Sequence, residues 1–359
     1  MKYNWQQNDW PEFQYDLSSI EPKLHEISLK MGRLSGLVDA LPDTVQTEAI
    51  IDMMVIEAIK TSEIEGEYLS RQDVMSSIRN NLGLHPKQDV NDDRAHGAAS
   101  LMLAVRNDYR LPLTKDMVFG WHKMLMLGNN KVLAGAWRTH DEPMQVVSGA
   151  LGKEKIHFEA PPSESVAQEM DKFITWFNQK HSISAIHSAL SHLYFESIHP
   201  FEDGNGRIGR SISEKALLQG LDHPALFSLS QAIENDKKSY YGALEAAQKS
   251  NETTLWLEYF IELILQAQNQ AEGQIDFVLK KVKFFDRFGS LLNDRQLRVV
   301  THMFEKYHDS DSQGMSATRY AKVTNTSKAT ATRDLQYLVQ KEVLIAMGAG
   351  RSTKYFLNI

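Results

Sequence analysis

The residues best suited to chemistry stand in one stretch, residues 199–210, which reads HPFEDGNGRIGR. Pro200 disfavours helical geometry in the residue before it, so His199 is expected at the end of an apolar helix. Imidazole is the side chain that changes protonation near neutral pH, which makes His199 a candidate base. Asp203 supplies a short carboxylate of the kind that shares Mg²⁺ with nucleotide phosphates.

Two glycines flank Asn205 in the segment 204–206 and predict a loop whose backbone N–H groups point into one concavity. The helix expected to begin near residue 206 or 207 adds its own unpaired N–H groups. Arg207 and Arg210 are three positions apart and therefore lie on one face of that helix. Two cations so close together at a positive helix end predict an anion between them, and a polyphosphate is the natural candidate.

This stretch resembles the active-site motif of the Fic family, HPFxDGNGRxxR, at every fixed position, and the resemblance covers roughly residues 113–250. It implies transfer of AMP from ATP to Ser, Thr or Tyr hydroxyls of proteins, the protein itself included, with Mg²⁺ bound and pyrophosphate released. In that chemistry His199 takes the proton of the target hydroxyl, Asp203 holds Mg²⁺, and Arg210 grips the γ phosphate. The second glycine of the cradle is intact, which favours AMP transfer over kinase-like chemistry. The residues implied to bind ATP are Gly204, Asn205, Gly206, Arg207, Ile208, Gly209 and Arg210, with Tyr240 and Tyr241 beside adenine.

Residues 61–66, TSEIEG, match the inhibitory pattern of the family, [S/T]xxxE[G/N]. The resemblance implies that Glu65 pairs with Arg210 and so misaligns ATP. A carboxylate at the C-terminal end of a helix opposes the helix dipole, and a cation supplied from elsewhere would relieve that cost. A solvated glutamate is the alternative. Some relatives use this glutamate to remove AMP from a modified protein, so de-AMPylation also stays open.

Helical periodicity dominates the rest of the chain, so the expected fold class is mainly α. The prediction is a Fic-type helical bundle with a β-hairpin flap and a C-terminal winged helix module. Alternating patterns at 145–148 and 155–159 predict the hairpin. In relatives such a flap registers the target segment through strand pairing, with Ile156, His157 and Phe158 as candidates here, and a purely structural hairpin is the alternative. The expected divisions are a helical region with the inhibitory helix at 1–100, a catalytic core at 101–266, a connecting helix at 267–289, and the winged helix domain at 290–359.

The C-terminal segment 315–359 holds seven Lys or Arg and two Asp or Glu, a balance of +5 in a chain of net charge −7. Its pattern of helix, turn, helix and two short strands resembles a winged helix, with Lys328 and Arg333 near the recognition helix. Contact with DNA is one interpretation, and a protein-docking or dimer module is the alternative. A DNA-binding regulator that only senses nucleotide is the rival to an enzyme, but such a sensor would need no base at His199.

The composition excludes several classes of protein. The 359-residue chain has no cysteine, which excludes disulfides and thiolate metal sites. It has no apolar run of about 18 residues, so no membrane span is indicated. The polar N-terminus lacks the apolar core of a signal peptide. Together these features favour the cytoplasm. The target protein stays undecided, and so does a homodimer, which the resemblance leaves open.

Overall fold

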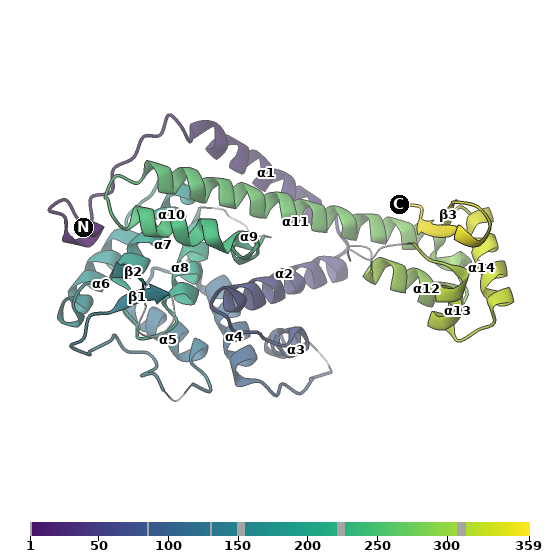
Figure 1. Ribbon diagram of the computed structural model, residues 1–359, viewed down its shortest axis with the longest axis horizontal. Coiled ribbons are helices and arrows are strands. Elements are labelled where there is room, and N and C mark those ends of the chain that lie inside the picture. The colour runs from purple at the N-terminus through teal and green to yellow at the C-terminus, as the bar shows by residue number, and fades with distance from the viewer. Residues whose placement is uncertain (1, 85, 130, 149–154, 221–226, 307–313) are drawn as a thin grey trace. The chain divides into compact units, whose positions relative to one another are not determined.

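The computed structural model describes residues 2–84, 86–129, 131–148, 155–220, 227–306 and 314–359. It is mainly helical, with two small antiparallel hairpins (Figure 1), which confirms the expected fold class. The chain divides into two compact units, residues 1–273 and 274–359.

The first unit holds the motif and most of the helices. It contains η1 (Asn4–Gln6), α1 (Glu21–Asp39), α2 (Asp43–Ile64), α3 (Arg71–Asn81), α4 (Asp93–Asp108), α5 (Lys115–Leu125), β1 (Gln145–Ser148), β2 (Lys155–Glu159), α6 (Ser163–Phe177), α7 (Ser184–Ile198), α8 (Asn205–Gln219), α9 (Leu229–Asn235), α10 (Lys237–Ala247) and the first part of α11 (Thr254–Phe288).

Helix α7 forms the centre of this unit, because every residue from Ala185 to Ile198 is buried. Its small side chains let α8 approach closely, and the hydroxyls of Ser188 and Ser213 lie 2.7 Å apart between the two helices. Ile208 on α8 is fully buried in the same apolar core. The motif loop joins α7 to α8, so both of its ends are anchored in the core.

Helix α2 brings the segment 61–66 to the motif. It packs against α3, α4, α8 and α9. The buried carboxylate of Glu57 accepts hydrogen bonds from the hydroxyls of Ser228 and Ser230 and from the Ser230 N–H, which ties α2 to α9. The helix ends at Ile64, and Gly66 follows with a positive φ of 81° that turns the chain.

The predicted hairpin of β1 and β2 is confirmed. Gln145 pairs with Glu159 and Val146 with Phe158, and the register then shifts at a bulge after Val146. A bulge bends the strand and increases its local twist. The glycines expected in the turn, at 149 and 152, lie outside the described residues.

The second unit contains the rest of α11, η2 (Gly289–Leu291), α12 (Asp294–Glu305), α13 (Ala317–Thr324), α14 (Lys328–Gln340), β3 (Leu344–Met347), η3 (Gly350–Ser352) and β4 (Lys354–Leu357). Tyr320, Leu335 and Leu338 are fully buried in its own apolar core. Three helices followed by an antiparallel hairpin is the order of elements expected of a winged helix.

Two of the expected domain boundaries differ from the structure. Residue 100 falls inside α4, which packs against both α3 and α5 and therefore cannot separate two domains. Residue 266 falls inside α11, because the end of the expected catalytic core and the connecting helix expected at 267–289 form one continuous helix. The two units divide within α11, between Gly273 and Gln274.

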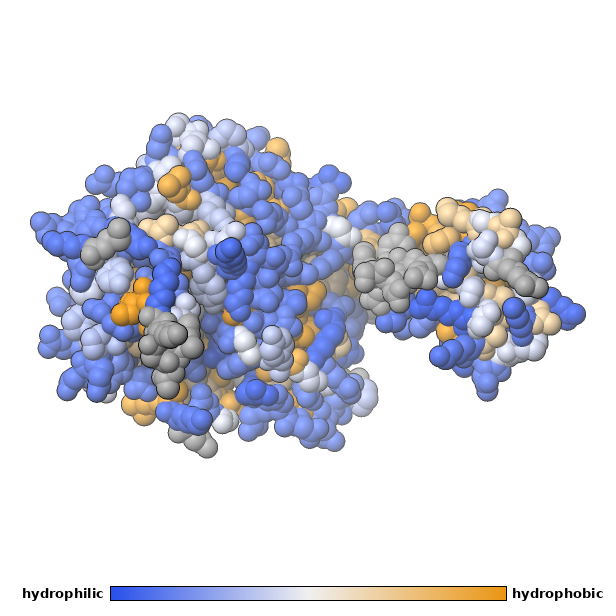
Figure 2. Space-filling view, in the orientation of Figure 1, coloured by the Kyte–Doolittle hydropathy of each residue, from blue (hydrophilic) through white to orange (hydrophobic). Residues whose placement is uncertain are grey.

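Within the described residues, no helix is both long and apolar enough to cross a membrane. The face of the molecule shown in Figure 2 is mostly hydrophilic, with small apolar areas between.

Candidate functional site

The candidate base stands at the end of α7. His199 caps this helix with a φ of +50°, a conformation that stops the helix, and its N–H still donates to the Phe195 carbonyl at 2.9 Å. After Pro200, the Phe201 ring is fully buried and stacks on His122 with 3.8 Å between ring centroids. The Phe201 ring therefore anchors the motif loop in the core.

His122 also fixes the protein backbone beside Asp203. The Gly135 N–H donates to His122 Nδ1 at 2.8 Å, so the ring hydrogen lies on Nε2, which contacts the Asp203 carbonyl at 3.1 Å. Burial lowers the pKa of His122, which keeps this ring neutral and its tautomer single. His122 therefore fixes the position of the backbone turn that carries Asp203.

Asn205 closes the loop on itself. Its Oδ1 accepts from the Phe201 N–H and its Nδ2 donates to the Phe201 carbonyl, each at 2.8 Å. The side chain is buried with both ends of its amide bonded to the Phe201 backbone, which leaves the backbone N–H of Asn205 to face an anion. Its side chain therefore shapes the loop in which Asn205 was expected to contribute to the phosphate cradle.

The N-terminus of α8 is open to an anion. The helix begins at Asn205 after Gly204, whose φ is +81°, and in the described part of the chain no side chain caps its first turn. Gly206 is helical, and its value lies in its missing Cβ: a Cβ there would collide with the carboxylate of Glu65 and lie 3.1 Å from Arg210 Nη1. A carboxylate thus already occupies the space where the helix end attracts negative charge.

Glu65 forms an ion pair with Arg210, as the family pattern predicted, with Arg210 Nη2 donating to Glu65 Oε1 at 2.8 Å. Arg210 also donates to the hydroxyl and carbonyl of Thr61, at 2.7 and 2.8 Å. Burial acts to lower the pKa of Arg210, but Glu65, Tyr240 and Tyr241 together outweigh burial and the pKa is raised. Arg210 Nη1 is buried and has no hydrogen-bond partner among the described residues, which leaves its two N–H donors for a ligand.

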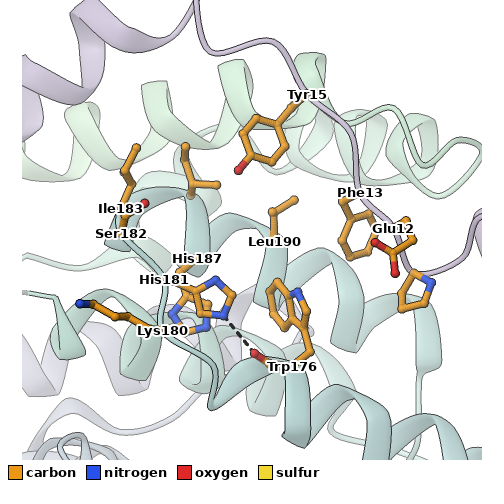
Figure 3. Close-up of a pocket in the computed structure, with 12 residues that line it drawn as sticks. Glu12, Phe13, Tyr15, Trp176, Lys180, His181, Ser182, Ile183, His187 and Leu190 are labelled. Atoms are coloured by element: carbon orange, nitrogen blue, oxygen red, sulfur yellow. Dashed lines mark hydrogen bonds between the residues drawn. The ribbon is translucent and has the colours of Figure 1, made fainter.

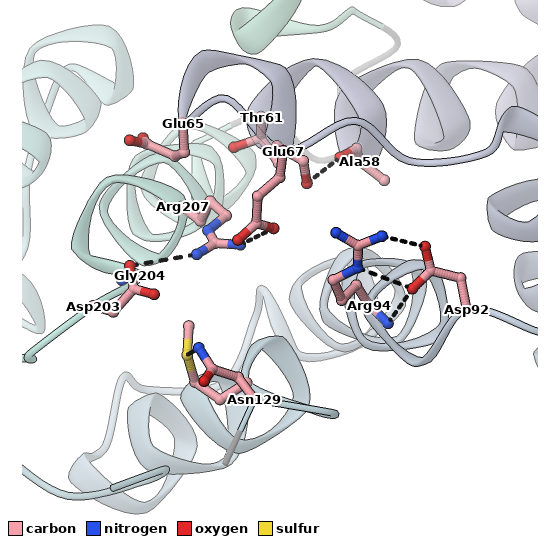
Figure 4. A network of polar contacts seen from close by, with 12 residues as sticks. Ala58, Thr61, Glu65, Glu67, Asp92, Arg94, Asn129, Asp203, Gly204 and Arg207 are labelled. Carbon is pink, nitrogen blue, oxygen red and sulfur yellow. Dashed lines mark hydrogen bonds and ion pairs between the residues drawn. The ribbon is translucent and has the colours of Figure 1, made fainter. Parts of the chain in front are cut away.

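Arg207 is held by a second glutamate (Figure 4). Its Nη1 donates to Glu67 Oε2 at 2.6 Å, and its Nη2 lies 3.6 Å from Asp203 Oδ1. The Arg207 side chain is 4% exposed. Arg207 and Arg210 were expected to share one anion, whereas in this structure Arg207 pairs with Glu67 and Arg210 pairs with Glu65.

A cavity of about 800 Å³ brings most of the predicted residues together. It lies between the β1–β2 hairpin, the motif loop and α10. Its predicted lining residues are Glu65, His157, Phe158, His199, Asp203, Gly204, Asn205, Gly206, Arg210, Tyr240 and Tyr241. Three residues expected to bind ATP are not among the described residues that line it: Arg207 turns toward Glu67, and the helical period carries Ile208 into the core and Gly209 toward Glu196.

The two tyrosines of α10 differ in exposure. Tyr240 is fully buried, and its hydroxyl is 2.7 Å from His192 Nε2. Tyr241 is 39% exposed and lies beside it, with 5.1 Å between ring centroids. Tyr241 is therefore the one with an aromatic surface open to a ligand.

The three flap candidates also differ. Phe158 is buried, with its ring against Tyr3 at 5.0 Å, so it anchors the hairpin. His157 Nδ1 contacts Glu245 at 2.7 Å. Ile156 is 48% exposed and is the candidate whose side chain a docked segment could reach.

Arg138 was not predicted as a site residue, yet it holds the backbone of the motif loop. It is buried and donates to the His199 carbonyl at 2.9 Å, to the Ser163 hydroxyl at 2.9 Å, and to the Pro161 carbonyl. His122, Thr61 and Glu67 were missed as contacts for a similar reason: each meets its partner from a distant part of the chain. Thr61 alone left a signal, as the first residue of the inhibitory pattern.

A second cavity of about 280 Å³ lies away from the motif, between the N-terminal segment and helices α6 and α7 (Figure 3). His187 and His181 stack there with 3.8 Å between ring centroids, beside Trp176. Burial lowers the pKa of His187 to about 3. The ring is therefore neutral at ordinary pH and belongs to the packing of this region.

Asp203 fits the role of a magnesium ligand. Its side chain is 47% exposed at the edge of the cavity, and its Oδ1 accepts from the Gly204 N–H at 2.6 Å. Magnesium on a nucleotide usually takes one or two protein carboxylates and completes its shell with phosphate and water oxygens. A single oriented carboxylate beside an open helix N-terminus satisfies that requirement.

Comparison with known proteins finds sequence relatives for parts of this chain. Residues 112–217 match the Fic/DOC family, and residues 3–84 match a domain of unknown function, DUF4172. A probable protein adenylyltransferase of Aquifex aeolicus is 31% identical over 94 residues, which are 26% of this chain and 29% of that protein. The protein adenylyltransferase Fic of Drosophila virilis is 29% identical over 191 residues, 50% of this chain and 37% of that protein. This chain thus spans well under half the length of either curated relative.

Solved structures share the fold. A Fic family protein from Desulfovibrio desulfuricans superposes with a TM-score of 0.56 at 18% identity, covering 94% of this chain and 96% of its own. Fic-1 from C. elegans gives a TM-score of 0.51 at 18% identity and covers 74% of each chain. At these identities the likeness is one of fold alone.

Proposed function

Because residues 112–217 form a domain of the Fic/DOC family, we propose that the protein transfers AMP from ATP to hydroxyl groups of proteins. One observation carries the proposal: the carboxylate of Glu65 sits against Gly206 and Arg210, in the same cavity as His199. A site that holds a carboxylate at a helix N-terminus suits a phosphate, and the imidazole supplies a base beside it.

In the proposed reaction, the oxygen of the target hydroxyl attacks the α phosphorus of ATP. His199 takes the hydroxyl proton, the bond from the α phosphorus to its bridging oxygen breaks, and pyrophosphate leaves. The free N–H groups of α8 and the guanidinium of Arg210 offset the charge on the phosphates. Such transfers depend mainly on positioning and electrostatics, which are what this loop and helix can supply.

Asp203 would hold Mg²⁺ together with the phosphates, and the ion would offset the charge of the departing pyrophosphate. Tyr241 would offer its face to adenine, with Tyr240 behind it. The exposed residues of the hairpin, Ile156 among them, would register an extended target segment by strand pairing. Ser, Thr and Tyr hydroxyls are the acceptors, and they include residues of the protein itself.

Glu65 would restrain this activity by occupying Arg210, which ATP needs for its γ phosphate. The same glutamate offers a second candidate activity, removal of AMP from a modified protein, because it lies beside the phosphate site where it could act as a base on water. The direction of the reaction is therefore part of the test.

The test is incubation of the full chain with Mg²⁺ and α-labelled ATP, followed by intact-mass analysis. We expect weak labelling in the wild type, strong labelling in Glu65→Gly, and none when His199→Ala is added to that variant. An added mass that corresponds to AMP supports the proposal. Equal labelling with and without His199 would refute it. Pre-labelled protein incubated with wild type and with Glu65→Gly tests removal, which only the wild type should perform.

DNA contact by the second unit is proposed as a separate function. Lys328 and Arg333 are exposed on α14, the helix in the position of a recognition helix, within a segment of positive local charge. Binding to duplex DNA should weaken with salt and be reduced in Arg333→Ala. Binding that Arg333→Ala leaves unchanged would assign this surface to another partner.

A further inference from the structure

Glu196 stands one helical turn before the candidate base, at the end of α7. Its side chain is 6% exposed, and its Oε2 lies 3.5 Å from His199 Nδ1. This distance is longer than a hydrogen bond, and catalytic contacts often tighten only when substrate is bound. His199 Nδ1 is buried and has no hydrogen-bond partner among the described residues. Glu196 is the acceptor placed to receive its hydrogen.

The space around the carboxylate is shaped for it. A Cβ on Gly209 of α8 would lie 2.5 Å from Glu196 Oε1 and 3.3 Å from the His192 ring. The missing side chain of Gly209 therefore lets Glu196 lie between the two helices. The Glu196 backbone carbonyl accepts from Gln248 Nε2 at 3.2 Å, which fixes this last turn of α7 to the residue after α10.

The charge of Glu196 is also retained. Burial acts to raise its pKa, but the neighbouring His199, His192 and Arg210 outweigh burial and lower the pKa. Glu196 is thus a buried carboxylate that accepts hydrogen bonds and cannot donate them.

We propose that Glu196 is a positioning residue for the base: it holds the hydrogen of neutral His199 on Nδ1 and leaves Nε2 free to take the proton of the attacking hydroxyl. The proposal rests on the proposed function for its catalytic consequence. The tautomer itself is a property of the resting protein. A neutral imidazole carries one ring hydrogen, and the partner of one nitrogen decides the state of the other. When Nε2 takes the proton, the adjacent carboxylate stabilises the resulting imidazolium, as in other base–carboxylate pairs.

The alternative is a structural role, in which Glu196 only fills space at the helix end. Glu196→Gln separates the two roles because it keeps the shape and removes the charge. A glutamine can turn either its oxygen or its NH₂ group toward His199 Nδ1, so it no longer dictates the tautomer. Glu202→Gln is the matched control, since Glu202 is an exposed residue that lines the same cavity.

The first measurement is NMR of the imidazole nitrogens in the full chain labelled with ¹⁵N-histidine, with His199 assigned through His199→Ala. We expect the Nδ1–H tautomer in the wild type and in Glu202→Gln. In Glu196→Gln we expect the Nε2–H tautomer or a mixture. This readout needs no ATP and no target, so it stands whether or not AMP transfer occurs.

The second measurement is AMP transfer in the Glu65→Gly background. Glu196→Gln should lower kcat about 10²-fold, within the range that a base contributes, and should change KM for ATP less than threefold. Glu196→Asp, which keeps the charge on a shorter side chain, should recover part of the lost kcat. A thermal unfolding curve for each variant confirms that it is folded.

The proposal is overturned if Glu196→Gln leaves the His199 tautomer unchanged, or if a folded Glu196→Gln transfers AMP at the rate of Glu202→Gln. If no variant transfers AMP while the tautomer responds to Glu196→Gln, the proposed function fails and the positioning of His199 by Glu196 stands.

Discussion

Glu67 and Arg207 form an ion pair with 2.6 Å between Oε2 and Nη1, although they are 140 positions apart in the chain. The neighbouring Glu65 pairs with Arg210 at 2.8 Å. One turn of three residues after α2 therefore occupies both arginines of the motif. Gly66 between the two glutamates has a φ of +81°, which lets the chain make this turn and send each carboxylate to a different arginine.

Removing the second carboxylate should free Arg207 for phosphate. We predict that Glu67→Gln binds ATP about tenfold more tightly than the wild type, which corresponds to about 1.4 kcal/mol, and that its effect adds to that of Glu65→Gly. Isothermal titration calorimetry with Mg²⁺ and ATP measures the affinity of each single variant and of the double variant. Glu63→Gln is the control, because Glu63 pairs with Lys60 on the same segment. Weaker ATP binding in Glu67→Gln would mean that Glu67 orients Arg207 for the phosphates.

The glycine at position 206 should be required for any anion at this site. In Gly206→Ala the new Cβ takes the space that the Glu65 carboxylate occupies, so both Glu65 and a phosphate lose their place beside α8. We expect ATP affinity to fall at least tenfold even in the Glu65→Gly background. Gly242→Ala is the matched control, because Gly242 is also a helical glycine that lines the cavity, with open space around its Cβ position. An equal effect of both substitutions would exclude the phosphate site proposed at Gly206.

The local parts of the site could be predicted because their residues stand together in the chain. His199, Asp203 and Gly204 are placed by one loop, and that loop follows from the proline and glycines of the motif. The hairpin could be predicted at its observed strands because alternation is a local signal. The Glu65–Arg210 pair was predicted only through the resemblance to a family, since nothing in either segment alone indicates the other.

The contacts between distant residues could not be predicted in this way. Arg138 reaches the His199 carbonyl from 61 positions away, and His122 reaches the Asp203 carbonyl from 81 positions away. A buried arginine bonded to carbonyls has no periodicity that distinguishes it from a surface arginine. The position of residue 266 inside a helix could not be predicted for a related reason: the sequence becomes polar after it, although α11 runs unbroken from Thr254 to Phe288.

Stability should fall between pH 7 and pH 5. Burial lowers the pKa of His187 to about 3 and also lowers that of His192. Below about pH 6.5 these histidines bind protons in the unfolded chain but stay neutral in the folded chain. The stability that the neutral rings contribute is therefore present above that pH and is lost as the pH falls. For His187 alone the loss is about 2 kcal/mol by pH 5.

Urea unfolding at pH 7 and pH 5 checks this prediction. His187→Phe keeps a ring against Trp176 and should reduce the loss between the two pH values by about 1–2 kcal/mol, whatever its effect at pH 7. His25→Phe is the control, because His25 is exposed on α1 and is not part of the buried cluster. The same pH dependence in the wild type and in His187→Phe would show that His187 is protonated as easily in the folded protein as in the unfolded chain.

Arg138 should be irreplaceable by lysine despite the equal charge. Its planar guanidinium reaches three acceptors, the His199 carbonyl, the Ser163 hydroxyl and the Pro161 carbonyl, and the single nitrogen of lysine cannot span them. Burial lowers the pKa of Arg138 to about 10, so the guanidinium remains charged and depends on these oxygens. We expect Arg138→Lys to lower the free energy of unfolding by about 2–4 kcal/mol in urea, since it leaves buried carbonyls unpaired.

Arg94→Lys is the control. It changes an exposed pair with Asp92 and should lower the free energy of unfolding by less than about 0.5 kcal/mol. Because Arg138 holds the backbone of the base, AMP transfer by the folded fraction should also fall in Arg138→Lys. A stability and an activity equal to those of Arg94→Lys would show that the loop keeps its shape without the clamp.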